Sequence, residues 1–211
     1  MISEIFLIIL FSYILGSIPS GVILAKFFAL DDIRKIGSGN TGTTNVLRTG
    51  NYSAAALTLI LDFSKACLAI YLTQMINGQL IILSSFLILL GHIFPIWLNF
   101  RGGKGVAAYF GILLIMSPLF SLLFIFMWVS TFVTTRYSSL ASITSIISIP
   151  VAYFMVNMMK LNDFIYYDFL SPQDMDFRIN FTIILFMSVI LIYRHMENIK
   201  RLIKGQESKL K

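Results

Sequence analysis

Long apolar runs follow one another through most of this 211-residue sequence, and they limit its possible folds more than any other feature. The runs occupy, to within a few residues, 5–28, 52–76, 80–98, 106–135, 137–159 and 179–193. About 20 consecutive apolar residues cross the hydrocarbon core of a membrane as a helix. Only 12% of the residues are charged, against about 25% in ordinary soluble domains. The sequence therefore predicts an all-α, polytopic membrane helix bundle. We expect residues 1–211 to form a single domain, because they contain no visible repeat or linker.

The run from residue 106 to residue 135 decides how many helices cross the membrane. Its 30 uncharged residues would form a helix of about 45 Å, which exceeds a hydrocarbon core of about 30 Å. Ser117-Pro118 lies near the middle of the run, and proline removes a backbone donor there. The run is therefore either one long kinked helix or two short helices.

The distribution of basic residues favours two short helices. Two helices give seven transmembrane spans, so that the chain termini lie on opposite sides of the membrane. With the N-terminus outside, the cytoplasmic side holds Lys26, Arg34, Lys35, Arg48, Arg101, Lys104, Arg136, Arg194, Lys200, Arg201, Lys204, Lys209 and Lys211. Only Lys160 and Arg178 then face outward, as the positive-inside rule requires. We expect seven transmembrane helices, a cytoplasmic C-terminus and an acidic outer loop at 160–178.

Three polar segments, 31–51, 99–105 and 194–207, fall on the cytoplasmic side in this arrangement. The first contains Gly-Ser-Gly-Asn-Thr-Gly-Thr-Thr-Asn at 37–45, followed by Arg48. Glycines let successive N–H groups converge on an anion, and arginine offers a bidentate fork that suits phosphate. The alternative is a polar turn that caps the following helix through Thr or Asn.

The second segment, Arg-Gly-Gly-Lys-Gly at 101–105, places Lys104 between glycines at the start of an apolar helix. A helix N-terminus already attracts anions, so the added ammonium group predicts a phosphate cradle. Arg101 and Lys104 could instead be positive-inside anchors, although anchors do not need three flanking glycines. His92 is better explained as a structural hydrogen-bonding residue than as a catalyst.

The third segment, Arg-His-Met-Glu-Asn-Ile at 194–199, brings His195 and Asn198 onto one face of a helix because they are three residues apart. Gly205 fits a helix stop. The alternative is a basic amphipathic tail that lies on anionic lipid. A site role for His195 and Asn198 and a lipid-binding role for the tail are compatible if different faces of the helix serve them.

Two further observations concern charge and metal binding. Asp62 and Lys65 are three residues apart within an apolar run, where charges are costly and usually paired. A structural ion pair explains them better than a proton path does. The two histidines are far apart and have no adjacent carboxylate cluster, so we expect no metal site. We also expect no cofactor.

Together the three segments resemble the acyl-phosphate:glycerol-3-phosphate acyltransferase family of bacterial membranes, nearly from end to end. The resemblance rests on the residues quoted above and on Gly-His-Ile-Phe-Pro at 91–95. Two departures are mild: Thr43 stands where the family usually has alanine, and Arg101 where lysine is common. Neither departure removes a functional group.

The resemblance implies transfer of a fatty acyl group from acyl phosphate to the 1-hydroxyl of glycerol 3-phosphate, the first step of phospholipid biosynthesis. The products would be lysophosphatidic acid and phosphate. The protein would be a multi-pass protein of the bacterial inner membrane, with its active site facing the cytoplasm. The resemblance gives catalytic roles to Lys104, His195 and Asn198. Substrate-binding roles are expected for Ser38, Gly39, Asn40, Arg48, Gly102, Gly103 and Ser142.

The implied partners are the two substrates, membrane lipid and an upstream enzyme that forms acyl phosphate, whereas no nucleic acid is expected. Two competing interpretations are a transporter of organic phosphates and a non-catalytic scaffold on anionic lipid. Transport sites usually lie near the membrane midplane in paired broken helices, but the polar segments here gather on one face. A scaffold would leave the first two segments unexplained.

Overall fold

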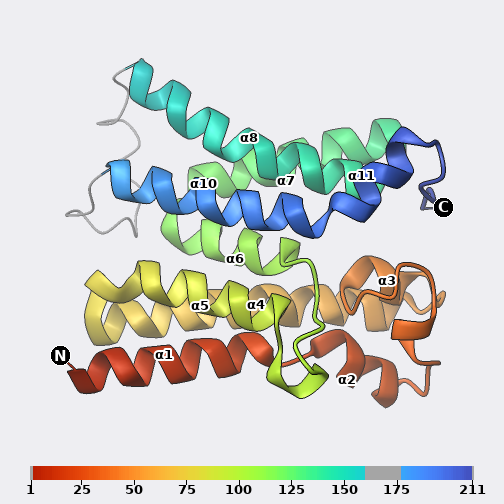
Figure 1. The fold of residues 1–211 in the computed structure, drawn as a ribbon, viewed down its shortest axis with the longest axis horizontal. Coiled ribbons are helices and arrows are strands. Elements are labelled where there is room, and N and C mark those ends of the chain that lie inside the picture. Colours follow the sequence, from red (N-terminus) through yellow and green to blue (C-terminus); the bar gives the residue numbers. More distant parts are fainter. Residues whose placement is uncertain (1, 160–176, 211) are drawn as a thin grey trace. The chain divides into compact units, whose positions relative to one another are not determined.

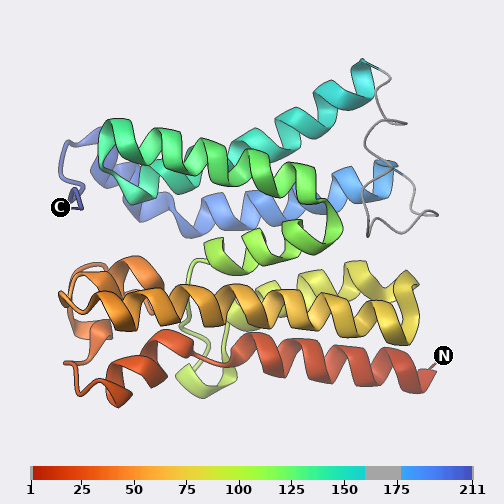
Figure 2. The same cartoon turned by 180° about the vertical axis from the view of Figure 1, so that it is seen from behind.

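The computed structural model describes residues 2–159 and 177–210, and these residues form helices with no strand among them. They separate into two compact units, Met1–Ile112 and Leu113–Lys211, each drawn from two sides in Figure 1 and Figure 2. The all-α prediction is confirmed, whereas the single-domain prediction stays a prediction. Most of the predicted outer loop, residues 160–176, lies outside the described residues.

The first unit is built on three helices that lie beside one another, α1, α4 and α5 (Figure 1). Its helices and turns are α1 (Ile2–Ser17), α2 (Ser20–Phe27), η1 (Ile33–Lys35), α3 (Thr43–Leu47), α4 (Tyr52–Asn77), η2 (Gly78–Leu80), α5 (Ile81–Ile93) and η3 (Ile96–Leu98). Helix α1 ends, α4 begins and α5 ends at the same end of this group (Figures 1 and 2). The first two polar segments therefore leave the group at one end.

Small and hydroxylated residues bring α1 and α5 together. The hydroxyl oxygens of Ser12 and Ser84 lie 2.8 Å apart, and a side chain at Gly91 would meet the backbone of α1 at Tyr13 and Ser17. Close backbone approach and hydroxyl hydrogen bonds are the usual means of joining helices in lipid, where apolar burial gives little driving force.

A proline divides the first apolar run. Pro19 has no N–H group, and its ring disfavours a helical conformation at Ile18. The chain accordingly bends by 42° between α1 and α2. The N-terminal run, predicted as one span, is thus a pair of helices with a break in its C-terminal half.

The second unit contains α7 (Pro118–Thr135), α8 (Ser138–Met158), α10 (Phe177–Arg194) and α11 (Met196–Ile203). Helix α8 contacts each of the other three, and the hydroxyls of Thr131 and Thr144 lie 2.9 Å apart between α7 and α8. The axis bends by 57° from α10 to α11. Helix α6 (Val106–Met116) precedes α7, so that the run 106–135 is two helices with a break at Ser117-Pro118.

Several helices are suited to a membrane. Three stretches among the described residues are long and apolar enough to cross one, namely Tyr52–Leu98, Pro118–Thr135 and Ser138–Met158. The number rises to five if each bent pair, α1–α2 and α10–α11, is one span. Helix α6 has 11 residues and a length of about 16 Å, which is short of the hydrocarbon core. The count of seven spans and the orientation of the termini stay predictions.

Candidate functional site

Asn45 holds the first polar segment in a closed loop. Its side chain is buried, and its amide Nδ2 donates to the carbonyls of Ile33 at 2.6 Å and Asn40 at 2.8 Å. Its Oδ1 accepts from the backbone N–H of Ser38 at 3.1 Å. Val46, the next residue, packs into a small apolar core under the loop. The loop is therefore fixed at both ends by buried contacts.

Arg48 lies at the end of α3, with its side chain against the loop that carries Ser38. Gly37 has φ +53°, and a Cβ there would come 2.6 Å from Asn45 Oδ1 and 2.9 Å from Arg48 Nη1. Only glycine allows both this backbone conformation and this approach of the guanidinium. Ser38 and Gly39 are exposed beside it. The loop thus brings one cation next to exposed hydroxyl and backbone groups.

The capping interpretation of this segment does not account for the loop. Helix α3 begins after Gly42 without a hydrogen bond from any side chain at its N-cap. A side-chain cap does occur at α4, after the loop, where Asn51 Oδ1 accepts from Ala54 N at 2.8 Å. Asn40 instead closes a local turn, because its Oδ1 accepts from Gly42 N at 3.0 Å.

The second polar segment folds back onto the end of α5. The backbone N–H groups of Gly102 and Gly103 donate to the carbonyls of Ile93 and His92, each at 3.1 Å. Both glycines are buried, and a side chain on Gly103 would clash with the His92 ring. These N–H groups fix the loop, so their predicted contact with substrate stays a prediction. Lys104 follows directly and is half-buried at the entry to α6.

Glu207 organises the third polar segment and was not identified from the sequence. Its carboxylate accepts from Ser139 Oγ at 2.8 Å, from Asn198 Nδ2 at 2.8 Å and from Arg201 Nε at 2.6 Å. Gly205 has φ +66° and ends α11, as predicted, so that the chain turns back and Glu207 reaches Asn198. Burial acts to raise the pKa of Glu207, but the three hydrogen bonds outweigh it and hold that pKa below its ordinary value.

His195 and Ser142 are each oriented by a neighbour in the second unit. The Nδ1 atom of His195 lies 2.7 Å from the carbonyl oxygen of Leu191. Because a carbonyl can only accept, Nδ1 carries the hydrogen and the neutral ring has its lone pair on Nε2. The hydroxyl of Ser142 accepts from Trp128 Nε1 at 3.2 Å and donates to Ser138 O at 2.9 Å.

The structure therefore groups the predicted site residues in two sets. The first unit holds the loop residues and both cations: Ser38, Gly39, Asn40, Arg48, Gly102, Gly103 and Lys104. The second unit holds Ser142, His195 and Asn198. Sequence reasoning missed the residues that orient them. Asn45 is the last residue of the quoted motif, and Glu207 follows the helix stop at Gly205, so the sequence pointed to both positions. Nothing in the sequence indicated Trp128.

Apolar helices with two cation-bearing loops at one end of the first unit fit a membrane protein that handles anionic groups. A sequence model of the glycerol-3-phosphate acyltransferase family matches residues 6–205. The glycerol-3-phosphate acyltransferase of Agrobacterium fabrum is 43% identical over 202 residues, covering 95% of this chain and 89% of that protein. Its counterpart in Pelagibacter ubique is 43% identical over 208 residues, covering 99% of this chain and 98% of that protein.

Solved structures agree with these relatives. The crystal structure of PlsY (YgiH), described as an integral membrane glycerol 3-phosphate acyltransferase in its glycerol 3-phosphate form, has a TM-score of 0.81 and 31% identity. The match covers 98% of this chain and 96% of that one. The lysophosphatidic acid form of PlsY has a TM-score of 0.80 and 30% identity. The chain thus belongs to the glycerol-3-phosphate acyltransferase family and is an acyltransferase, as the sequence predicted.

The Glu207 network leads to a prediction on pH. Because the pKa of folded Glu207 lies below its ordinary value of 4.5, its stabilisation is complete above that pH and is lost as the pH falls through the folded pKa. Glu207→Gln should lower the stability of the detergent-solubilised protein at neutral pH by about 1–3 kcal/mol. It should also reduce the loss of stability in acid, measured by thermal unfolding from about pH 3 to pH 7.

Glu197→Gln is the matched control, since Glu197 lies on α11, the helix of Asn198 and Arg201, but pairs with Lys200 at an exposed position. That variant should follow the wild type at every pH. Identical acid-unfolding curves for Glu207→Gln and the wild type would contradict the network.

Proposed function

We propose that this acyltransferase moves a fatty acyl group from acyl phosphate to the 1-hydroxyl of glycerol 3-phosphate, releasing lysophosphatidic acid and phosphate. The observation that carries the proposal is the pair of cations at one end of the first unit. Arg48 is seated against the Gly37 loop and Lys104 on the folded 99–105 loop. The glycerol 3-phosphate and lysophosphatidic acid forms of PlsY support the acceptor and the product.

The choice of acyl phosphate as donor follows from the chemistry that the chain offers. An acyl phosphate already carries a good leaving group, so the protein need supply mainly positioning and charge stabilisation. The sequence contains no Gly-x-Ser-x-Gly nucleophile elbow. It also lacks an aspartate five residues after either histidine, the spacing used by acyl-CoA-dependent glycerolipid acyltransferases: Trp97 follows His92, and Lys200 follows His195.

The reaction is a direct transfer in one acyl-exchange step. The oxygen of the 1-hydroxyl forms a bond to the acyl carbonyl carbon, and the bond from that carbon to the phosphate oxygen breaks. Phosphate leaves with the electron pair. The hydroxyl proton passes to a substrate phosphate oxygen. No covalent intermediate on the protein forms.

The cations of the first unit have the role of holding phosphate. Two phosphorylated substrates repel each other, and a bidentate Arg48 together with a flexible Lys104 lowers that repulsion. Ser38, Gly39 and Asn40 contribute hydroxyl, backbone and amide groups from the exposed loop. Gly102 and Gly103 contribute mainly by placing Lys104.

The residues of the second unit orient neutral polar groups of the substrates. Asn198 is held by Glu207, Ser142 by Trp128, and His195 by Leu191 O. With its lone pair on Nε2, neutral His195 accepts a hydrogen bond from a hydroxyl. Fixed rotamers of this kind are needed for a reaction that depends on positioning.

The proposal includes the membrane arrangement expected from the sequence. Seven spans with the N-terminus outside place the cation-bearing loops on the cytoplasmic face of the bacterial inner membrane. An enzyme that forms acyl phosphate would supply the donor from that side. The excess of basic residues in the loops assigned to the cytoplasm supports this orientation.

The role of Lys104 gives the most direct mutational test. Lys104→Ala should lower kcat/KM for glycerol 3-phosphate by about a hundredfold or more, since a charge aimed at the reacting groups is removed. Lysophosphatidic acid formed from acyl phosphate by the purified protein is the readout. The control is Lys26→Ala, which removes an exposed cation of the same unit and should keep near-normal activity. Equal activity of both variants would remove Lys104 from the site.

The proton acceptor is tested by the pH dependence of His195→Asn. If a substrate phosphate oxygen accepts the proton, this variant should have a lower kcat but keep the acid limb of the wild-type pH–rate profile. A flattened acid limb would show that His195 is the general base.

A further inference from the structure

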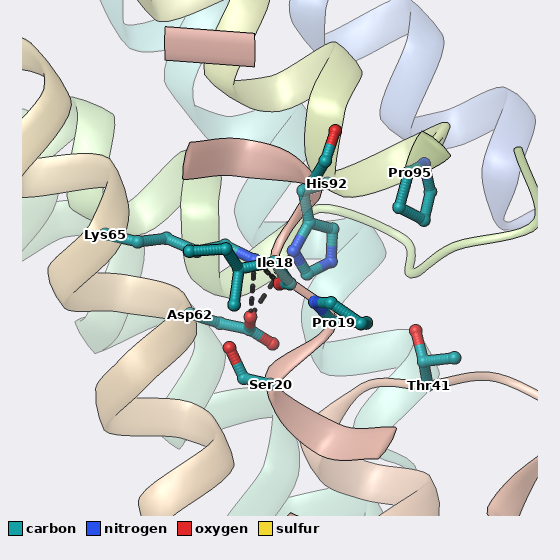
Figure 3. Close-up of a pocket in the computed structure, with 9 residues that line it drawn as sticks. Ile18, Pro19, Ser20, Thr41, Asp62, Lys65, His92 and Pro95 are labelled. Carbon is teal, nitrogen blue, oxygen red and sulfur yellow. Dashed lines mark hydrogen bonds and ion pairs between the residues drawn. The ribbon is translucent and has the colours of Figure 1, made fainter. Parts of the chain in front are cut away.

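A buried charged pair in the first unit has no role in the reaction proposed above. Asp62 and Lys65 both lie on α4, with side chains 3% and 6% exposed, and Lys65 Nζ is 2.8 Å from Asp62 Oδ1 (Figure 3). The structural ion pair predicted from their spacing is confirmed. Such a pair is a costly way to fill space, because replacing both charges by apolar groups of similar volume is often neutral or stabilising. Its presence therefore needs an explanation other than stability.

Lys65 connects the pair to the first polar segment. Its Nζ donates to the carbonyl of Ile18 at 2.7 Å, at the break between α1 and α2. Helix α2 starts just beyond the break, and Gly21 lies so close to the backbone of Thr41 that a side chain there would clash with the Thr41 carbonyl. The ammonium group thus fixes the helix on which the Ser38–Arg48 loop is packed.

His92 connects the pair to the second polar segment. Its Nδ1 lies 3.6 Å from Asp62 Oδ1, and its carbonyl accepts from Gly103 N at 3.1 Å. The other ring nitrogen, Nε2, lies against Gly103. A change in the position of the imidazole would therefore move the residue that precedes Lys104.

Both segments approach the ion pair at one small pocket (Figure 3). Thr41 from the first segment and Pro95 from the turn before the second line this pocket together with Asp62, Lys65 and His92. In Figure 3 the dashed lines from Asp62 reach both Lys65 and His92, so that one carboxylate serves both connections.

We propose that Asp62 and Lys65 are positioning residues that set the places of the two phosphate-holding loops of the first unit. Asp62 acts through His92 on Gly103 and Lys104, and Lys65 acts through Ile18 and α2 on the loop of Arg48. The inference rests on the proposed function in so far as these loops hold substrate phosphate. Neither residue of the pair contacts substrate in this account.

The test separates the position of the loops from the stability of the fold. Asp62→Asn and Lys65→Met each leave one buried charge without its partner, so both single variants should be less stable than the wild type. The double variant Asp62→Asn/Lys65→Met removes both charges and should recover much of that stability in thermal unfolding. If the pair positions the loops, the recovered double variant should still have a KM for glycerol 3-phosphate raised by about tenfold to a hundredfold.

Hydrogen–deuterium exchange gives a second readout that does not depend on activity. The amides of residues 99–105 should exchange faster in the double variant than in the wild type. Thr73→Val is the matched control, since Thr73 is buried on the same helix and its hydroxyl donates only to the preceding turn at Ala69 O. That variant should leave both KM and loop exchange unchanged.

The outcomes distinguish this inference from the proposed function. A stable double variant with wild-type KM and wild-type exchange at 99–105 would overturn the positioning role. If the double variant does not fold, His92→Leu and His92→Asn take its place. The asparagine variant keeps a donor facing Asp62 and should retain a lower KM than the leucine variant, and equal values would also overturn the inference. Failure of the wild type to form lysophosphatidic acid would refute the proposed function, while loop exchange would still test the pair.

Discussion

A break in a helix leaves backbone N–H and C=O groups that need partners, and where apolar residues surround the break water is not there to supply them. The loops of this chain are arranged around that constraint. In the first unit, buried polar side chains or folded-back amides serve three such places: Lys65 at Ile18, Asn45 at Ile33 and Asn40, and the amides of Gly102 and Gly103 at the end of α5. The groups that close the breaks also fix the loops that carry Arg48 and Lys104. The same hydrogen bonds therefore satisfy the backbone polar groups and set the geometry of the candidate site.

The two units contribute different chemistry. The candidate residues of the first unit bring positive charge on glycine-containing loops, which suits phosphate. Those of the second unit are polar groups that neighbouring residues orient: Glu207 orients Asn198, Trp128 and the Ser138 carbonyl orient Ser142, and the Leu191 carbonyl orients His195. A reaction whose donor already has a good leaving group gains most from such fixed groups, because they need little reorganisation when charge develops. The proposed reaction therefore does not need a conventional nucleophile and base.

The sequence predicted the helices well because lipid-facing helices need long apolar runs. The predicted run at 52–76 begins with α4 and stops one residue before its end, and the run at 137–159 differs from α8 by one residue at each end. The break at Ser117-Pro118 lies where proline indicated. The break at Pro19 was missed although Ser17 and Ser20 lie beside it, because the longer apolar stretches before and after them read as one continuous run. The Asp62–Lys65 pair was predicted from its helical spacing and from the cost of an unpaired charge within an apolar run.

The contacts of the orienting residues could not be predicted from the sequence, for a physical reason. Glu207 contacts Asn198 only because Gly205 reverses the chain, and it contacts Ser139 across 68 positions. Trp128 reaches Ser142 through the packing of α7 on α8. Contacts of this kind depend on tertiary packing, whereas the cations and glycines of the two loops are adjacent in sequence and stand out as motifs.

The central claim is direct acyl transfer from acyl phosphate to glycerol 3-phosphate. A single-turnover reaction of the purified protein with acyl-labelled acyl phosphate and unlabelled glycerol 3-phosphate tests it most directly, with a parallel reaction that contains labelled acyl-CoA instead. The account predicts labelled lysophosphatidic acid from acyl phosphate, none from acyl-CoA, and no label on the protein after quenching. Product from acyl-CoA alone, or a labelled acyl-enzyme that is consumed as product forms, would contradict it.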